Sequence, residues 1–123
     1  MYYLVMADDT ADDLQNRWFR GALEACVLGT LRAGPAYGYE IAGRIEAAGF
    51  VRPKGGTLYP ILARLEGERL VEPKWMDGDG GPSRKYYGLT PAGAATAEET
   101  AQHWNRFANN VSALLGNTVR SRS

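Results

Sequence analysis

Cysteine and histidine are scarce in this chain, with one of each among 123 residues. The single cysteine, Cys26, excludes an internal disulfide and fits a reducing cytoplasm. Long apolar runs are also lacking, because no stretch approaches the ~20 residues that a membrane-spanning helix needs. No signal peptide is evident, since acidic residues follow the apolar residues 1–7 and no basic flank precedes them. We therefore expect a cytoplasmic protein with no membrane partner.

The same scarcity argues against an enzyme. Cys26 falls on the apolar stripe of one predicted helix and His103 on the surface of another, so neither has a partner for nucleophilic or acid–base chemistry. The spacing of Asp77 and Asp79 resembles the start of a calcium loop, but glycines stand where later oxygen ligands belong. We expect no catalytic residues, no cofactor and no metal site.

Net charge is absent too, because 14 basic residues balance 14 acidic ones. A neutral chain argues weakly against nucleic-acid binding, but the charges are unevenly placed. Residues 1–48 hold seven acids and four bases, whereas residues 49–90 hold five acids and seven bases. Any DNA affinity should therefore come from a few placed contacts in the mildly basic middle of the chain rather than from a broad field.

Two helices are predicted in the first half of the chain. Apolar residues recur at three- and four-residue steps from about residue 14 to residue 32. Gly34 and Pro35 break this helix, and a second one is expected from Tyr37 to about Ala48, where Gly49 would end it. Hydrophobic residues make up 45% of the chain and charged residues 23%, so we expect one globular domain.

The segment 54–66 organises the rest of the chain. We expect a helix capped near Gly56 or Thr57, with Pro60 in its first turn, where a missing N–H does no harm. Helical spacing gives it one apolar stripe, made of Leu58, Ile61, Leu62 and Leu65. Small and hydroxyl-bearing residues occupy the outer face, with cations at its edges: Gly56, Thr57, Tyr59, Pro60 and Ala63, then Lys54 and Arg64. Such a face admits a polyanion closely, although the same pattern also fits an amphipathic helix without a partner.

After Arg69 the hydrophobic period changes from 3.6 to 2. Two strands are predicted, over residues 70–75 and 84–89, with a glycine-rich hairpin tip at residues 77–83.

Thr90 and Pro91 then predict the cap and first position of a last helix, which runs to about Leu115 and stops at residues 116–117. A helix of this length is about 37 Å long, more than the preceding core can cover, so a partner helix is implied. Its seam follows a heptad spacing and comprises Ala97, Ala101, Trp104, Ala108, Val111 and Leu115.

These elements predict a mainly α fold with a small β-hairpin, a winged helix-turn-helix domain followed by a long C-terminal dimerisation helix. We divide the chain into an N-terminal arm (1–13), the winged domain (14–89), the dimerisation helix (90–116) and a disordered tail (117–123).

Three blocks of sequence stand out in order along the chain. They are Gly34-Pro35 with Gly38-Tyr39-Glu40, then Gly56-Thr57-Leu58-Tyr59-Pro60 with Leu65-Glu66, then Gly80-Gly81-Pro82 with Arg84-Lys85-Tyr86-Tyr87, Leu89-Thr90 and Gly93. Together these blocks resemble PadR-type transcriptional regulators. The resemblance implies a homodimeric repressor whose third helix enters the major groove of a palindromic operator while the hairpin lies against the backbone. Thr57 and Tyr59 match the family's groove-facing residues, and Arg84 and Lys85 match its basic wing. The expected DNA-binding set is therefore Lys54, Gly56, Thr57, Tyr59, Arg64, Arg84 and Lys85.

Three positions depart from the family pattern. Tyr37 stands where members usually carry His, Arg69 where they carry Gly, and Gly88 where they carry a cation. We expect Tyr37 to change a contact at the second helix and Gly88 to weaken the charge of the wing. Arg69 removes a favoured left-handed helix terminator, for which Gly67 is a candidate replacement.

Trp104 suggests a small-molecule site between two subunits. Its neighbours on the seam are alanines, which leave space that a close-packed coiled coil would fill with larger side chains. A planar aromatic effector could stack there, with Trp18, Phe19 or Phe107 completing the walls. The compact branch that this chain resembles, with its single C-terminal helix, includes multidrug-sensing repressors and places a tryptophan at the matching point. The competing interpretation is that Trp104 only fills the dimer core.

A second class of function fits the same elements. A winged helix that has lost DNA affinity could serve as a protein-interaction or ligand-sequestering module, and the zero net charge and Gly88 favour that alternative. Salt-dependent binding to the DNA upstream of the chain's own gene separates the two.

Overall fold

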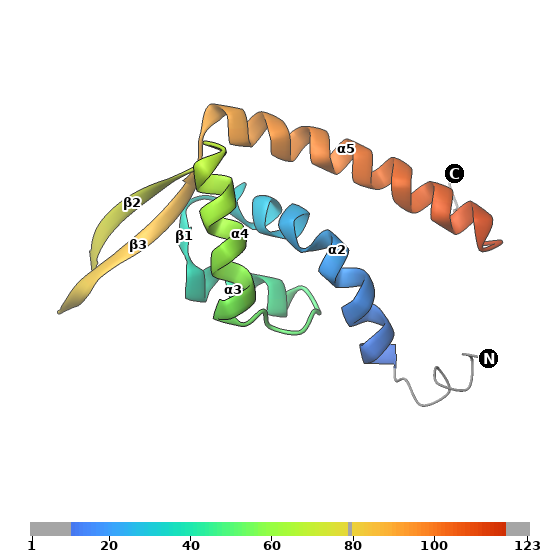
Figure 1. Ribbon diagram of the computed structural model, residues 1–123, viewed down its shortest axis with the longest axis horizontal. Coiled ribbons are helices and arrows are strands. Elements are labelled where there is room, and N and C mark those ends of the chain that lie inside the picture. Colours follow the sequence, from blue (N-terminus) through green and yellow to red (C-terminus); the bar gives the residue numbers. More distant parts are fainter. Residues whose placement is uncertain (1–10, 79, 118–123) are drawn as a thin grey trace.

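The structure, a computed structural model, describes residues 11–78 and 80–117. This part of the chain folds into four helices and a small antiparallel sheet (Figure 1). The helices are α2 (Ala11–Leu31), α3 (Gly38–Ala47), α4 (Gly55–Gly67) and α5 (Pro91–Leu114). The strands are β1 (Ala36–Tyr37), β2 (Val71–Gly78) and β3 (Gly81–Leu89), in the order β1-β3-β2. The predicted fold class is confirmed, with β1 as a third strand that the sequence did not suggest.

The core lies where α2, α3 and α4 pack together and against the base of the sheet. Its largest fully buried side chains are Val27, Ile41, Ile45, Leu58, Leu62, Leu65 and Val71. Leu58, Leu62 and Leu65 are buried members of the predicted stripe of α4, and Ile61 packs half-buried against them. The apolar stripe therefore fixes which face of α4 turns inward and leaves its small, hydroxyl-bearing face outside.

Helix α4 begins earlier than the sequence suggested. Its N-cap is Lys54, and the backbone N–H groups of Thr57 and Leu58 both donate to the Lys54 carbonyl at 2.9 Å. The predicted cap at Gly56 or Thr57 is wrong, because both residues are wound into the first turn. Pro60 accordingly lies in the second turn, where its missing N–H deprives the Gly56 carbonyl of its helical partner.

Helix α4 ends in a Schellman motif built around an arginine. Leu70 N–H donates to the Leu65 carbonyl at 2.9 Å, and Arg69 N–H donates to the Glu66 carbonyl at 3.0 Å. Arg69 itself has φ = 62°, in the left-handed region that glycine usually occupies. The expectation that Gly67 would take over this role is wrong, since Gly67 is the last helical residue of α4.

The hairpin of β2 and β3 is longer than predicted. Its register pairs Val71 with Leu89 and continues to Gly78 opposite Gly81, with an irregularity between Met76 and Gly78. The ladder thus extends into the glycine-rich segment that had been assigned to the tip. Figure 1 shows the hairpin projecting on one side of α4, while α5 runs away on the other.

Helix α5 begins as predicted. The Thr90 hydroxyl accepts from Gly93 N–H at 2.9 Å, Pro91 occupies the first helical position, and Gly116 has φ = 84° just past the helix end. The first turns pack against α2, where Arg32 and Glu98 form an ion pair of 2.8 Å. Beyond them most of the helix is exposed, including Phe107, Leu114 and Leu115.

The ends of the chain limit two further expectations. Helix α2 starts at Ala11 rather than near residue 14, so it reaches into the segment assigned to the arm. The rest of the arm, residues 1–10, and all of the expected tail except Asn117 lie outside the described residues. Within the described residues, no helix has the length and apolar character required to cross a membrane.

Candidate nucleic-acid interface

The outer face of α4 carries most of the residues that the sequence nominated for DNA binding. Lys54, Gly56, Thr57 and Tyr59 are all exposed at the N-terminal half of the helix. The first turn of a helix presents backbone N–H groups and a partial positive charge, which favour phosphate. Gly55, Gly56 and Thr57 are small residues and therefore keep this end of the helix open to a polyanion.

Tyr59 is held in place by glycines on two elements. A β-carbon on Gly38 would lie 2.2 Å from the Tyr59 hydroxyl oxygen, and one on Gly55 would lie 3.4 Å from its ring. Half of the Tyr59 surface is nevertheless exposed. The phenol therefore rests against the start of α3 and the start of α4, with an outer side free to meet a partner.

Arg52 belongs to the same surface, although the sequence did not single it out. Its guanidinium donates to the Tyr39 carbonyl at 2.9 Å and to a Glu46 carboxylate oxygen at 3.2 Å. It also lies 4.3 Å from the centroid of the Tyr39 ring, a cation–π distance. A small cavity of about 170 Å³ lies between α3 and α4, bordered by Gly38, Tyr39, Arg52, Gly55 and Tyr59 among others.

The wing joins this surface through Tyr37. The Arg84 guanidinium donates to the Tyr37 hydroxyl at 3.1 Å and lies 4.8 Å from the centroid of its ring. The Tyr37 ring is stacked on Tyr39 with centroids 6.4 Å apart and meets Tyr86 edge-on at 5.2 Å. Arg84, Tyr37, Tyr39 and Arg52 thus form a continuous cation–tyrosine row from β3 to the loop before α4. From the sequence, Arg84 was expected to bind DNA and Tyr37 was noted as a departure from a family pattern, but no sequence pattern connects the two.

Arg64 and Lys85 are placed differently from the other nominated cations. Arg64 forms an ion pair with Glu24 of α2. Lys85 lies 3.2 Å from a carboxylate oxygen of Glu66 and 5.3 Å from the centroid of the Tyr87 ring. The hydrogen bond to Glu66 raises the pKa of Lys85, while burial raises the pKa of the Tyr87 hydroxyl. Both cations therefore have acidic partners within the chain.

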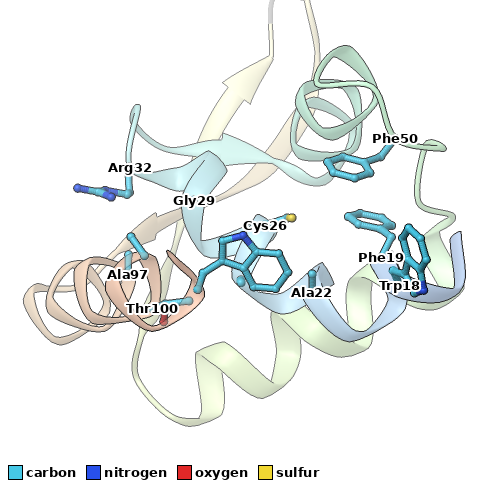
Figure 2. A pocket seen from close by; sticks show the side chains of 12 residues that line it. Trp18, Phe19, Ala22, Cys26, Gly29, Arg32, Phe50, Ala97 and Thr100 are labelled. Carbon is cyan, nitrogen blue, oxygen red and sulfur yellow. The ribbon is translucent and has the colours of Figure 1, made fainter. Parts of the chain in front are cut away.

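A larger apolar cavity of about 530 Å³ lies between α2 and α5. Figure 2 shows Trp18, Phe19 and Phe50 at one end, Arg32, Ala97 and Thr100 at the other, and Cys26 between them. Of the predicted effector residues, Trp18, Phe19 and Trp104 line it, whereas Phe107 packs on Trp104 with ring centroids 5.6 Å apart.

Phe50 is a wall residue of this cavity that the sequence did not reveal. Its ring stacks on Phe19 at 4.3 Å, although it belongs to the loop between α3 and α4. Cys26 lies half-buried in the wall, and burial raises the pKa of its thiol. The cavity is thus lined almost entirely by aromatic and small side chains, which suits a flat apolar molecule.

The predicted dimer seam divides into two parts. Ala97 is buried in the core of the chain, and Ala101 and Trp104 border the cavity. Ala108 is half-buried, whereas Val111 and Leu115 are exposed. Leu114, absent from the predicted seam, is 90% exposed. The distal half of α5 therefore carries an apolar surface that is largely open in the single chain.

No cluster of three or more His, Cys, Asp or Glu side chains that could hold a metal occurs among residues 11–78 and 80–117. His103 lies exposed on α5.

Comparison with known proteins places these features in one family. The sequence profile of the transcriptional regulator PadR-like family matches residues 27–99. A protein of Lysinibacillus sphaericus, described only as uncharacterized protein X, is 33% identical over 87 residues, which are 69% of this chain and 80% of that protein.

Solved structures agree with the profile. A PadR family transcriptional regulator from Eggerthella lenta is 32% identical and superposes with a TM-score of 0.77, covering 90% of this chain and 96% of the other. Bacillus subtilis PadR, in a crystal structure with operator DNA, is 26% identical with a TM-score of 0.57. That match covers 63% of this chain and 44% of the Bacillus subtilis chain.

Proposed function

The chain belongs to the PadR-like family of transcriptional regulators, and we propose that it is a cytoplasmic repressor that binds a palindromic operator as a homodimer and releases it when a planar aromatic ligand binds. The observation that carries the proposal is the exposed N-terminal half of α4, with Lys54, Thr57 and Tyr59 beside the cation–tyrosine row. The operator complex of Bacillus subtilis PadR supports it.

DNA would be met by two adjoining parts of one surface. Gly56, Thr57 and Tyr59 on α4 supply small and hydroxyl-bearing groups for the major groove, where hydrogen bonds read base edges. Lys54 at the start of α4 and Arg84 on the wing supply positive charge for the phosphate backbone on either side. Tyr37 holds Arg84 on this surface, so the chain needs no net positive charge to place a cation beside the DNA backbone.

A second copy of the chain would complete the distal half of α5. Phe107, Val111, Leu114 and Leu115 are exposed apolar residues on a helix whose first turns are already packed against α2. Pairing of α5 with its symmetry mate would bury them and place the two α4 helices about one turn of DNA apart, ~34 Å. An aspartate at Val111 or Leu115 would put an unpaired carboxylate into that interface and is expected to yield monomers.

Ligand control would act through the cavity between α2 and α5. Trp104 and Trp18 border it, and in a dimer its open side would lie near the second subunit. A molecule bound there would change the angle between the subunits and so the spacing of the two α4 helices. It would weaken DNA binding only to the extent that it prefers the form that does not fit the operator.

The decisive experiment is fluorescence anisotropy of the unmodified protein on DNA from upstream of its own gene, at several salt concentrations. We expect binding that weakens steeply with salt and is competed poorly by unrelated DNA. Tyr59→Ala should weaken binding and relax the sequence preference, whereas Arg106→Ala, which removes a cation on α5, should change neither. Absence of any DNA binding at low salt would favour a winged helix that binds proteins or ligands instead.

A further inference from the structure

Arg84 and Lys85 are neighbours in sequence but face opposite sides of the wing. Arg84 is paired in register with Met76 and Lys85 with Trp75, and successive side chains on a strand alternate between faces. Arg84 reaches Tyr37 on one face, whereas Lys85 shares the other face with the buried Tyr87. The two cations of the wing therefore cannot make equivalent contacts with one partner.

Lys85 is paired with an acidic residue of its own chain. Its ammonium is 3.2 Å from Glu66, and both side chains retain only about a third of their accessible surface, 33% and 35%. Glu66 lies in the last turn of α4, and its carbonyl accepts the N–H of Arg69 in the Schellman motif that leads into β2. The pair therefore joins β3 directly to the end of the helix from which β2 departs.

We infer that Lys85 is a positioning residue that fixes the wing against α4 by pairing with Glu66, and that Arg84 alone of the two carries charge to the DNA backbone. This inference rests on the proposed function. A carboxylate at 3.2 Å largely cancels the attraction of Lys85 for a phosphate. Moving Lys85 to a phosphate would also leave Glu66 unpaired close to a polyanion.

The consequence for recognition is geometric. The base of the wing is already fixed at Val71, which is buried in the core, and at Leu70, whose N–H completes the Schellman motif. The backbone of β3 is also paired with β1 at Tyr86 and Tyr87. The Lys85–Glu66 pair adds a side-chain attachment directly to α4, so the distance from Arg84 to the outer face of α4 is set before DNA arrives and less ordering is required on binding.

Two kinds of measurement test the assignment. The first needs no DNA and follows hydrogen exchange of the hairpin amides in the free protein. We expect Lys85→Met and Glu66→Gln each to speed exchange by about two- to fivefold, the effect of losing a partly exposed ion pair. The double variant should go no further, and Lys85→Arg should restore protection. Lys74→Met, which removes a cation from the opposite face of the hairpin, is the matched control and should leave exchange unchanged.

The second measurement is the salt dependence of DNA affinity. Arg84→Met should reduce the slope of log affinity against log salt by about one, as expected for one lost phosphate contact. Lys85→Met and Glu66→Gln should each lower affinity about two- to fivefold without changing the slope.

The two measurements distinguish failure of the role assigned to Lys85 from failure of the proposed function. Tighter DNA binding by Glu66→Gln, together with a lower slope for Lys85→Met, would make Lys85 a phosphate contact and overturn the inference. Unchanged hydrogen exchange in both variants would also overturn it, whatever the DNA result. Failure of the unmodified protein to bind DNA, with the exchange results as expected, would overturn the proposed function and the role assigned to Arg84 while leaving the attachment by Lys85 in place.

Discussion

Gly93 lies directly against Leu70: a β-carbon on Gly93 would fall 1.8 Å from the Leu70 carbonyl oxygen. The same carbonyl accepts Thr90 N–H at 3.1 Å, and the Thr90 hydroxyl donates to the Arg69 carbonyl at 2.7 Å. The end of α4, the start of β2 and the start of α5 thus meet in one joint with no room for a side chain. Any reorientation of α5 would be passed directly to the end of α4.

Gly93→Ala should destabilise the protein by about 2 kcal/mol or more, since the obstacle is backbone and cannot be relieved by a side-chain rotation. Gly21→Ala is the control, because a β-carbon there meets nothing within 4 Å on the exposed side of α2. That change should raise the free energy of unfolding by about 0.5–1 kcal/mol through helix propensity. Urea denaturation followed by circular dichroism measures both. Equal effects of the two alanines would contradict the joint.

Arg69→Gly should stabilise the protein by about 1 kcal/mol, because a left-handed φ costs a residue with a β-carbon roughly that much relative to glycine. The hydrogen bonds of the Schellman motif involve only backbone and would be kept. Arg69→Ala separates this effect from loss of the guanidinium and should bring no such gain.

Gly67→Ala provides the complementary test two residues earlier. Gly67 is helical, so alanine there should stabilise by about 0.5–1 kcal/mol. Destabilisation by Gly67→Ala and none of the expected gain from Arg69→Gly would show that Gly67 is the terminator after all.

Gly38→Ala should change DNA recognition more than stability. The clash it creates is with the hydroxyl end of Tyr59, which can swing away, rather than with backbone. Displacing that phenol should relax sequence preference to about the same extent as Tyr59→Ala, measured by competition between operator and scrambled DNA. In the Tyr59→Ala background the Gly38→Ala change should have no further effect on specificity. Additive losses would mean that Gly38 acts independently of Tyr59.

The parts of the fold that depend on local sequence could be predicted from it. The apolar stripe of α4 and the Thr90–Pro91 start of α5 involve residues within one or two helical turns of one another. The N-cap at Lys54 was not predicted, because lysine is not a favoured capping residue and the Lys54 side chain makes no cap hydrogen bond, whereas threonine is favoured at that position.

Contacts between distant residues could not be read from the sequence. Arg84 and Tyr37 are 47 positions apart, and their hydrogen bond depends on the pairing of β1 with β3. Periodicity does not reveal a two-residue strand such as β1. For the same reason the sequence does not show the acidic partners of Lys85 and Arg64, because Glu66 and Glu24 are brought to them only by tertiary packing.

Trp104 should report ligands that enter the cavity between α2 and α5. Trp104 is 46% exposed and borders that cavity, whose wall also includes the stacked Phe19 and Phe50. Titration with a planar aromatic cation such as methylviologen should quench tryptophan emission with saturation, because a flat cation stacks favourably on indole.

Trp18 and Trp75 also emit, so Trp104→Phe is the necessary control. Trp18 borders the same cavity, whereas Trp75 lies on the hairpin. We expect Trp104→Phe to lose most of the saturable quenching and Trp75→Phe to retain it. The same ligand should release operator DNA from the unmodified protein, with the midpoint of release following the midpoint of quenching, because the two binding events are linked. Quenching that survives in Trp104→Phe, or that never saturates, would leave Trp104 as a packing residue, since an indole at a helix seam needs no ligand to account for it.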